Sequence, residues 1–542
     1  MRANKFLRSF EGGFYDPRTV QDGIVPENAS TYMYNVDTST GIIRVARGFT
    51  KLTNYNFPST IQSIWQDTYD NKIYVVSGGR LFQLDGTTYS VTSLTASPVF
   101  STTSRVTFVR QGDYIFMVDG TVMPVVYNTA TASFVTSGTN YPTSWGSNRF
   151  PLYAINWNGR IFCFVKDNNT TGVQYDFIFY SKLYNALDWT ASATDPSAGG
   201  AFQIGQDGTR ITAMYPFNEQ IWIGKEKGLY SFGGDTKFET STKSPEYDQT
   251  TFNYSYLYPN ITIASPYGVV AYGGAVYFWG KNRVYTVFVS ENKSQTSSPE
   301  SISDMITSAV IDSNSAFTDV QGVFDTRLNR IWFNACASAT STKFDRVFCY
   351  SPVTKAWSGL RQSYSHFCYA NAVINGEIRI LSGGYAGNNY VYLQDQGTTF
   401  DGTPIDWQYT TPYMVINDDY QCKPKYVTIF YKKSANEGFQ YNYALDFAAS
   451  TDEAYNIGAN ESNVSTWHDP NSDSTSTWGD AYPSGTTGTW VSEKTQSSQF
   501  RIANSGHRIR HQFSSTGLSG DCDIISISVS YTTIGDKGTH AS

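Results

Sequence analysis

The sequence predicts an all-β protein: a β-propeller of about seven blades, with six or eight as the alternatives, followed by a β-sandwich domain. Three observations lead to this prediction. Charged residues make up only 16% of the 542-residue chain while aromatic residues also reach 16%, a composition that favours strands over helices. A hairpin pattern recurs through the first 400 residues, and the composition changes after Phe400.

The recurring unit is well represented by NEQIWIGKEKGLYSF, residues 218–232. Ile221, Trp222 and Ile223 precede a Gly-bounded turn, and an aromatic-rich segment follows it, which is the usual signal of two antiparallel strands. Related hairpins occur along the chain, and their anchor residues are Ile73, Ile115, Ile161, Ile221, Val276, Ile331 and Ile378, with steps of 42, 46, 60, 55, 55 and 47 residues. Four short strands with their turns need roughly 40–50 residues, as in a propeller blade. Two or three β-sandwiches are the alternative arrangement of evenly spaced strands.

One copy carries a sharper signal. RVFCYSPVTKAWSGL, residues 346–360, resembles a kelch-type blade: a strand ends at Tyr350, a turn follows at Ser351 and Pro352, and Trp357 opens the next strand. We expect the tryptophans of this region to pack between adjacent blades. They are Trp65, Trp157, Trp222, Trp279, Trp332 and Trp357.

Three segments are expected from the order of these patterns. Residues 1–54 form an N-terminal arm and a short strand pair that turns at Thr40 and Gly41. Residues 55–399 form the propeller. Residues 400–542 form the sandwich, with a final strand near Ile524 to Tyr531 and a polar insertion near 449–490. That insertion has too few aliphatic residues to form its own core, and its three tryptophans suggest a draped loop.

The charge and cysteine content narrow the function classes. The formal net charge of −7 argues against a general nucleic-acid binder, which would carry a basic excess. The six cysteines show no CxxC pair, so we expect buried free thiols; they are Cys163, Cys336, Cys349, Cys368, Cys422 and Cys522. The N-terminus lacks the apolar core of a signal peptide, and we expect no membrane-spanning segment.

A search for catalytic and metal-binding patterns gives no candidate. The Asp-box turns of sialidases, Ser-x-Asp-x-Gly-x-x-Trp, do not occur. His366 is the only histidine in the propeller region, while His507 and His511 lie on one face of an expected strand about 13 Å apart, which suits no helical zinc motif. We expect no enzyme activity and no cofactor or metal. Paired carboxylates for glycoside hydrolysis cannot be recognised by spacing, so a carbohydrate-active propeller enzyme remains an alternative, as does a kelch-like protein-interaction module.

The N-terminal segment IVPENASTYMYNVDTSTGIIRVARGFTKL, residues 24–52, resembles the opening of the tail nozzle proteins (tail hub or stabilisation proteins) of short-tailed bacteriophages. The matching residues are Pro26, Ala29, Asn35, Gly41, Ile42, Arg44, Gly48, Phe49 and Leu52, with Arg47 just before Gly48. The spacing is slightly longer than in the tightest form of the pattern. IDWQYTTPYMV, KPKYVTIFYKK and the closing GHRIRHQFSSTGLSGDCDIISISVSY resemble the β-sandwich of the same family.

This resemblance implies a virion protein: a ring of six copies below the portal and adaptor, forming the tube through which DNA leaves the capsid. Its partners would be other copies of the chain, the adaptor and portal-side tail proteins, and tail fibres. Arg44 and Arg47 would then be contacts to a neighbouring subunit or adaptor, or else a solvated or intrachain salt-bridged pair. The acidic excess is 46 minus 39, or 7 charges per chain and 42 in six copies. We therefore expect the ring to have a neutral to acidic lumen with no specific DNA site. The competing idea is a bore in which Arg508 and Arg510 bind the phosphate backbone of the DNA.

Overall fold

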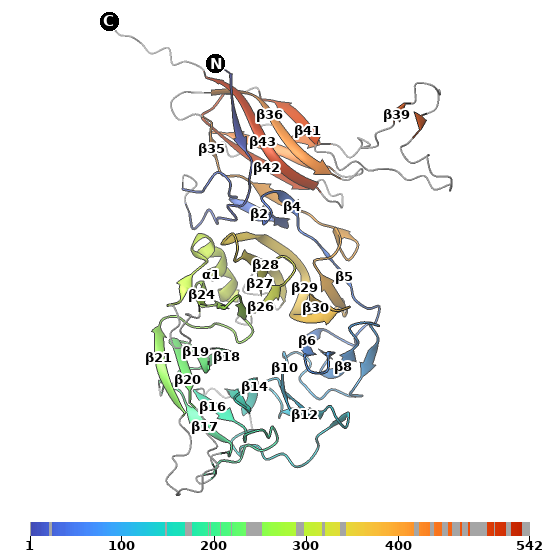
Figure 1. Cartoon of the computed structure of the whole chain (residues 1–542), viewed down its shortest axis with the longest axis vertical. Helices are drawn as coiled ribbons and strands as arrows, with labels where there is room; N and C mark the ends of the chain where they lie inside the picture. Colours follow the sequence, from blue (N-terminus) through green and yellow to red (C-terminus); the bar gives the residue numbers. More distant parts are fainter. Residues whose placement is uncertain are drawn as a thin grey trace. The chain divides into compact units, whose positions relative to one another are not determined.

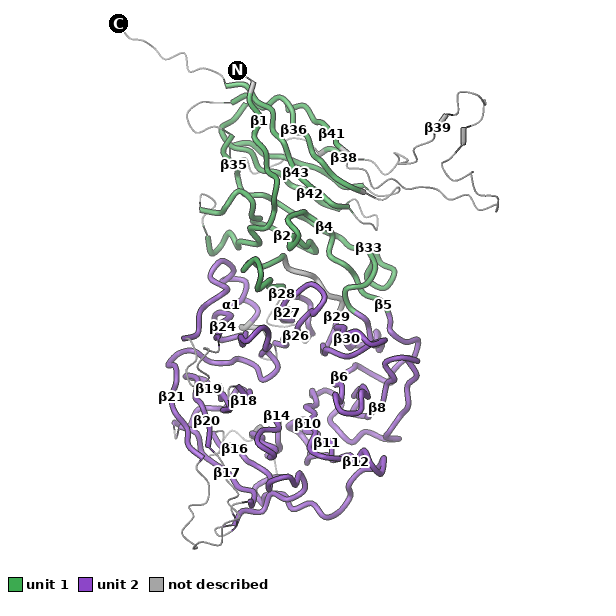
Figure 2. The backbone as a smooth tube through the Cα atoms, viewed as in Figure 1, with its two compact units in different colours: residues 1–50, 348–362, 394–542 green, residues 51–347, 363–393 purple. Residues whose placement is uncertain are grey.

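The computed structural model describes most of the chain in the form of two compact units. The described residues are 2–20, 24–146, 149–167, 176–192, 195, 197–205, 207–217, 219–234, 252–288, 298–316, 320–336, 343–416, 422–433, 438–446, 454–457, 467–468, 475–476, 496–502, 505–515 and 522–533. Unit 1 consists of residues 1–50, 348–362 and 394–542, and unit 2 consists of residues 51–347 and 363–393 (Figure 2). The division near residues 50 and 393 lies close to the expected boundaries at 54 and 399, but the N-terminal and C-terminal segments belong to one unit.

Unit 2 contains a β-propeller whose first five blades are separate four-stranded antiparallel sheets. The first blade consists of β6 (Ile61–Asp67), β7 (Lys72–Ser77), β8 (Arg80–Leu84) and β9 (Val91–Ser93). The second consists of β10 (Thr107–Gln111), β11 (Tyr114–Val118), β12 (Val125–Asn128) and β13 (Ser133–Phe134). The third blade consists of β14 (Arg149–Trp157), β15 (Arg160–Asp167), β16 (Phe177–Tyr180) and β17 (Gly200–Gln203). The fourth consists of β18 (Ile211–Phe217), β19 (Gln220–Lys225), β20 (Gly228–Gly233) and β21 (Asn253–Pro259). The fifth is β22 (Val269–Tyr272), β23 (Ala275–Trp279), β24 (Val284–Phe288), β25 (Glu300–Ser301).

Two further blades complete the ring, so the described part of unit 2 has seven. The unit 2 part of the sixth is built on β26 (Gln321–Asp325), β27 (Arg330–Ala335) and the start of β28 (Phe344–Ser351), and that of the seventh on the later part of β29 (Ala356–Ile374), β30 (Glu377–Gly384) and β31 (Val391–Gln394). The beginning of unit 2 lies beside the last blade, because the Leu52 N–H donates to the Val391 carbonyl at 2.8 Å. The blades follow one another around the ring in sequence order (Figure 1).

The seven anchor residues all lie in the second strand of their blades. Each anchor is the second residue of that strand to pair with the first strand: Ile73 pairs with Gln66, Ile221 with Pro216 and Ile331 with Phe324. Six of the seven side chains are fully buried, while Ile378 is 47% exposed. The predicted hairpin at 218–232 is β19 paired with β20. The propeller prediction is confirmed by this common register and by the sheet topology.

Hydrophobic side chains fill the spaces between neighbouring blades. One cluster joins Trp222 of the fourth blade to Phe278 of the fifth, whose ring centroids are 6.4 Å apart. Trp279 similarly contacts Phe333 of the sixth blade at 5.5 Å, and Trp65 stacks on Phe108 at 5.4 Å. These contacts confirm the prediction for Trp65, Trp222 and Trp279, whereas Trp357 contacts Tyr350 of the paired strand β28 at 5.0 Å. Such large apolar side chains supply most of the burial that holds the ring together.

Unit 1 contains the β-sandwich. Its first sheet is β3 (Val36–Asp37), β4 (Ile43–Val45), β43 (Cys522–Thr533), β36 (Cys422–Lys433) and β41 (Gln496–Arg501), with β1 (Arg2–Leu7) also paired to β43. Its second sheet has β2 (Tyr32–Tyr34), β34 (Gln408–Thr410), β42 (Arg508–Ser515), β37 (Phe439–Leu445) and β38 (Ala454–Ile457), with β35 (Met414–Val415) paired to β42. Rings from the two sheets meet between them, as Tyr431 and Phe439 do at 5.2 Å. The segment expected as an N-terminal arm thus contributes strands to both sheets.

The remaining elements are short. β32 (Thr399–Phe400) pairs with β5 (Phe49–Lys51) and with β33 (Thr403–Pro404). β39 (Trp467–His468) pairs with β40 (Thr475–Ser476). Most of the expected polar insertion at 449–490 lies outside the described residues. A 3-10 turn η1 (Asp304–Ile306) leads into α1 (Thr307–Ala316), the only α-helix in the described part of the chain. The sequence did not predict this helix, because the buried side chains of its described part are the small or polar Ala309 and Ser313 together with Val310.

Candidate functional site

Of the two arginines singled out in the sequence, Arg44 is the middle residue of β4 and Arg47 lies two residues after its end. Arg44 pairs in the sheet with Asp37 and Asp523, and its guanidinium forms an ion pair with the Asp523 carboxylate at 2.8 Å. Arg47 follows the strand and its side chain is exposed. The charge of Arg44 is therefore balanced within unit 1, while Arg47 presents its charge to solvent.

Other residues that carry the family resemblance have structural roles in unit 1. The Ala29 carbonyl accepts the Tyr409 hydroxyl at 3.1 Å, and the Asn35 side chain, at a backbone φ of 51°, donates to the Asp406 carbonyl at 2.7 Å. Gly48 lies so close to the main chain of Thr399 that a Cβ would come within 1.8 Å of its oxygen. The matching pattern therefore reflects the folding requirements of this unit.

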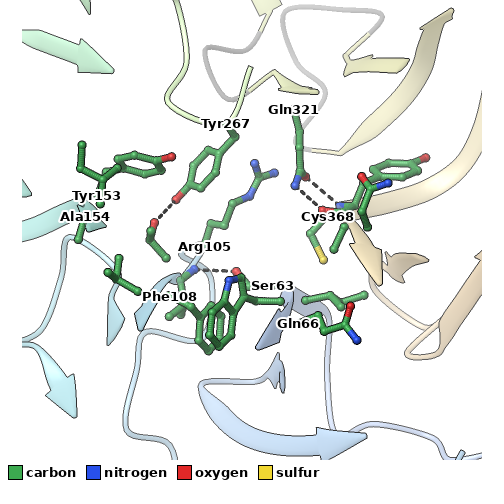
Figure 3. A pocket seen from close by; sticks show the side chains of 18 of the residues that line it. Ser63, Gln66, Arg105, Phe108, Tyr153, Ala154, Tyr267, Gln321 and Cys368 are labelled. Carbon is green, nitrogen blue, oxygen red and sulfur yellow. Dashed lines mark hydrogen bonds between the residues drawn. The ribbon is translucent and has the colours of Figure 1, made fainter. Parts of the chain in front are cut away.

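A cavity of about 580 Å³ lies at the centre of the propeller. Its wall consists of residues from the first strands of six blades, together with Tyr267, which precedes the first strand of the fifth blade. Figure 3 shows these side chains converging from the surrounding strands. The cavity has the size of a small-molecule site, because ligand pockets are usually about 300–1,000 Å³.

Polar side chains in this wall join neighbouring blades through the main chain. The Ser63 hydroxyl of the first blade accepts the Val106 N–H at 2.8 Å, and Gln66 accepts the Val373 N–H of the seventh blade at 2.7 Å. The Gln321 amide binds both main-chain groups of Tyr369, accepting its N–H at 2.8 Å. These bonds satisfy inward-facing main-chain groups that the blades cannot pair internally.

Arg105 is the charged group that stands out in the wall. It precedes β10, is 9% exposed and projects into the cavity beside Tyr267 (Figure 3). Its Nη2 donates to the Phe367 carbonyl at 2.8 Å, and its guanidinium carbon lies 4.5 Å from the ring centroid of Tyr267 and 5.1 Å from that of Phe344. The Nε and Nη1 atoms have no hydrogen-bond partner among the described residues. The guanidinium is thus held by aromatic rings and one carbonyl.

Burial keeps the side chains of Cys368 and Tyr153 in the cavity wall, and of His366 near it, uncharged at neutral pH. Burial raises the pKa of the Cys368 thiol to about 12, and the nearby Arg105 charge only partly opposes this shift. Burial likewise lowers the pKa of His366 to about 3, and it raises the pKa of Tyr153, with smaller contributions from Tyr267 and Tyr215. The Cys368 thiol of this wall is therefore not available as a thiolate nucleophile at neutral pH.

The other expectations about ligating side chains can be compared with the structure. All six cysteines are buried and free, as predicted. His511 lies in β42 and is buried, with its Nδ1 2.8 Å from the Tyr441 hydroxyl, and His507 immediately precedes that strand. Across the described ranges, no group of three or more His, Cys, Asp and Glu side chains could hold a metal ion. In the same ranges, no helix is long and apolar enough to cross a membrane.

Sequence reasoning did not identify Arg105. It is a single basic residue in the Ser- and Thr-rich segment STTSRV, and nothing in this segment indicates that the side chain projects into the central cavity. The only local signal is the strand that starts two residues later. Convergence of the blades, rather than local pattern, places this charge at the centre of the ring.

Comparisons with known proteins add the following. No family model matches the chain, and no curated protein matches it. Among solved structures, the chain is similar to the β-propeller domain of Myceliophteria thermophila Cps50 (Swd1), with a TM-score of 0.40 and 8% sequence identity, over 64% of this chain and 99% of that one. The protein is an all-β protein with a β-propeller, and this assignment rests on its own sheet topology.

Proposed function

We propose that the protein is a structural component of a short-tailed phage tail: a tail nozzle that forms a ring, most simply of six copies, through which genomic DNA is ejected. The observation that carries this proposal is where the segments with family resemblance lie. β4, which contains Arg44, pairs with β43, and β43 pairs with β36, although these strands come from opposite ends of the chain. Both resembling regions therefore contribute strands to one sheet, as we would expect if together they form one assembly unit.

In this proposal the propeller and sandwich serve as rigid structural parts of the virion. Arg47 is the better candidate for a contact to a neighbouring subunit or adaptor, because it is exposed whereas Arg44 is already paired with Asp523. Tail fibres and portal-side proteins would bind other surfaces of the ring.

The enzyme alternative receives less support from the cavity. Glycoside hydrolysis usually needs two carboxylates facing the same bond. The residues that line the cavity include arginine, glutamine, asparagine, serine and tyrosine, but neither aspartate nor glutamate. A kelch-like interaction module would use the same propeller as a monomer bound to one partner.

Light scattering coupled to size-exclusion chromatography distinguishes these alternatives. The purified chain is mixed with the adaptor and fibre proteins encoded beside it, and in parallel is incubated with bacterial surface polysaccharide. We expect a closed high-mass assembly with the adaptor and no release of reducing ends. A chain that stays monomeric with every partner and cleaves the polysaccharide would overturn the proposal. A one-to-one complex would instead indicate an interaction module.

A further inference from the structure

The charge of the central cavity is unbalanced. Arg105 is nine-tenths buried, and none of the residues in the cavity wall is acidic. The other arginine of the wall, Arg110, differs because it forms ion pairs with Asp67 at 2.6 Å and with Asp70 at 3.3 Å. A buried charge without a counter-charge is costly, and an anion within the cavity would remove that cost.

Unpaired hydrogen-bond donors in the wall also indicate that the cavity binds an anion. Arg105 has two nitrogens, Nε and Nη1, without an acceptor among the described residues. Both are donors. Because buried polar groups in native proteins are nearly always paired, the wall has unused capacity to bind an acceptor.

Aromatic rings define the rest of the wall. Trp65 and Phe108 are stacked with an interplanar angle of 2°, and Tyr153 meets Tyr267 edge-to-face at 5.4 Å. Tyr267 is itself fixed by a 3.0 Å hydrogen bond with Thr107. Rigid aromatic surfaces of this kind suit a planar organic body, and a cavity of about 580 Å³ is larger than a single inorganic oxyanion requires.

We propose that the propeller cavity binds a small planar organic anion, with its carboxylate or phosphate group near Arg105 and its body against the aromatic side chains of the wall. This site is independent of the role of the protein in a tail, since it lies within unit 2 and needs no partner subunit. Arg105 supplies the charge that selects an anion, and the rings select its shape.

Calorimetric titration of the full chain tests this with three probes: benzoate, its uncharged analogue benzamide, and inorganic phosphate. We expect benzoate to bind at least tenfold more tightly than benzamide and than phosphate. Equal affinity for benzoate and benzamide, or no binding of benzoate, would overturn the proposal. Phosphate binding as tight as that of benzoate would overturn the planar organic part of it.

Three variants locate the site. Arg105→Met should weaken benzoate binding at least tenfold, and Arg105→Lys, which keeps the charge, should weaken it less. Arg283→Met is the control, because Arg283 is exposed and pairs with Asp304 outside the cavity wall, and it should bind benzoate unchanged. If Arg105→Met does not fold, two other measurements test whether Arg105 binds the anion: the affinity of Arg105→Lys for benzoate, and the comparison of benzoate with benzamide in the wild type. Unchanged binding by both Arg105 variants, or equal losses in the control, would contradict the assignment.

Discussion

Arg44 and Asp523 form a two-point ion pair in unit 1 although they are 479 residues apart in sequence. Nε of Arg44 donates to Oδ1 of Asp523 at 2.9 Å, and Nη2 donates to Oδ2 at 2.8 Å. The two residues also pair directly between β4 and β43. One arginine of the N-terminal pattern thus fastens the N-terminal strand pair to the last strand of the chain.

Replacing Arg44 by Ala should lower the free energy of unfolding of unit 1 by about 1 kcal/mol, the upper end for exposed pairs, because the geometry is bidentate but the Arg44 side chain is 39% exposed. Urea denaturation measures this loss. Arg47→Ala is the matched control and should leave stability unchanged, since Arg47 is exposed. Equal effects of the two substitutions would show that the ion pair does not stabilise the sheet.

The Asp325–Arg330 pair in the sixth blade should matter much more. Its side chains are 4% and 0% exposed, and the N–O distance is 3.0 Å. Asp325→Asn keeps the shape but removes the carboxylate charge that faces the buried guanidinium of Arg330, so we expect a loss of about 3–5 kcal/mol. Asp304→Asn, in the exposed pair with Arg283, should cost no more than about 1 kcal/mol. Similar losses in both variants, measured by urea denaturation, would contradict this account of burial.

Stability should depend on pH through His511. Burial lowers its pKa in the folded protein to about 3, from about 6.5 in the unfolded chain. The unfolded chain therefore takes up the proton first, and stability present above pH 6.5 is lost as the pH falls from about 6.5 towards 3. In this range the free energy of unfolding changes by up to about 1.4 kcal/mol per pH unit for one histidine.

The double variant Tyr441→Phe/His511→Phe removes this titration together with the hydroxyl that contacts Nδ1. Its free energy of unfolding should fall less steeply between pH 6.5 and 4.5 than that of the wild type. Tyr441→Phe alone keeps the histidine and should retain the wild-type slope. Parallel curves for the wild type and the double variant would show that His511 does not titrate on unfolding.

The assembled protein should bind duplex DNA weakly. Each chain carries an excess of 7 acidic residues, and a conduit must let a polyanion pass without retaining it. Arg510 is one of the two residues that could bind the phosphate backbone of DNA, and its guanidinium carbon lies 4.9 Å from the Tyr413 ring centroid. DNA binding is measured at low and at moderate salt. Tight binding that weakens steeply with salt would indicate a channel that holds phosphates, and the passive conduit would have to be abandoned.

The propeller could be predicted because its strongest signal is local. Ile73, Ile161 and Ile331 are fully buried in second strands, and this position demands a β-branched or similarly apolar residue in nearly every blade. Ile378 has the same register but is exposed, and the first buried residue of that strand is Ile380. The pattern therefore located the strand correctly, even where burial is shifted by two residues.

The remaining features depend on contacts that are distant in sequence. Arg2 pairs with Thr532 in β1 and β43, and no local pattern indicates that the ends of the chain share a sheet. Arg105 acquires its position from the rings of Tyr267 and Phe344, which lie far along the chain. α1 was missed because a helix with one mostly small buried face resembles a polar loop in sequence.

Negative-stain electron microscopy tests the central claim most directly: that this chain is the ring-forming nozzle of a phage tail. The purified protein is imaged alone and together with the neighbouring tail proteins. We predict closed rings with six-fold symmetry and a central bore, and a ring that forms only with a partner agrees with the proposal. Single particles of one chain under every condition, with no ring in the presence of the adaptor, would contradict it.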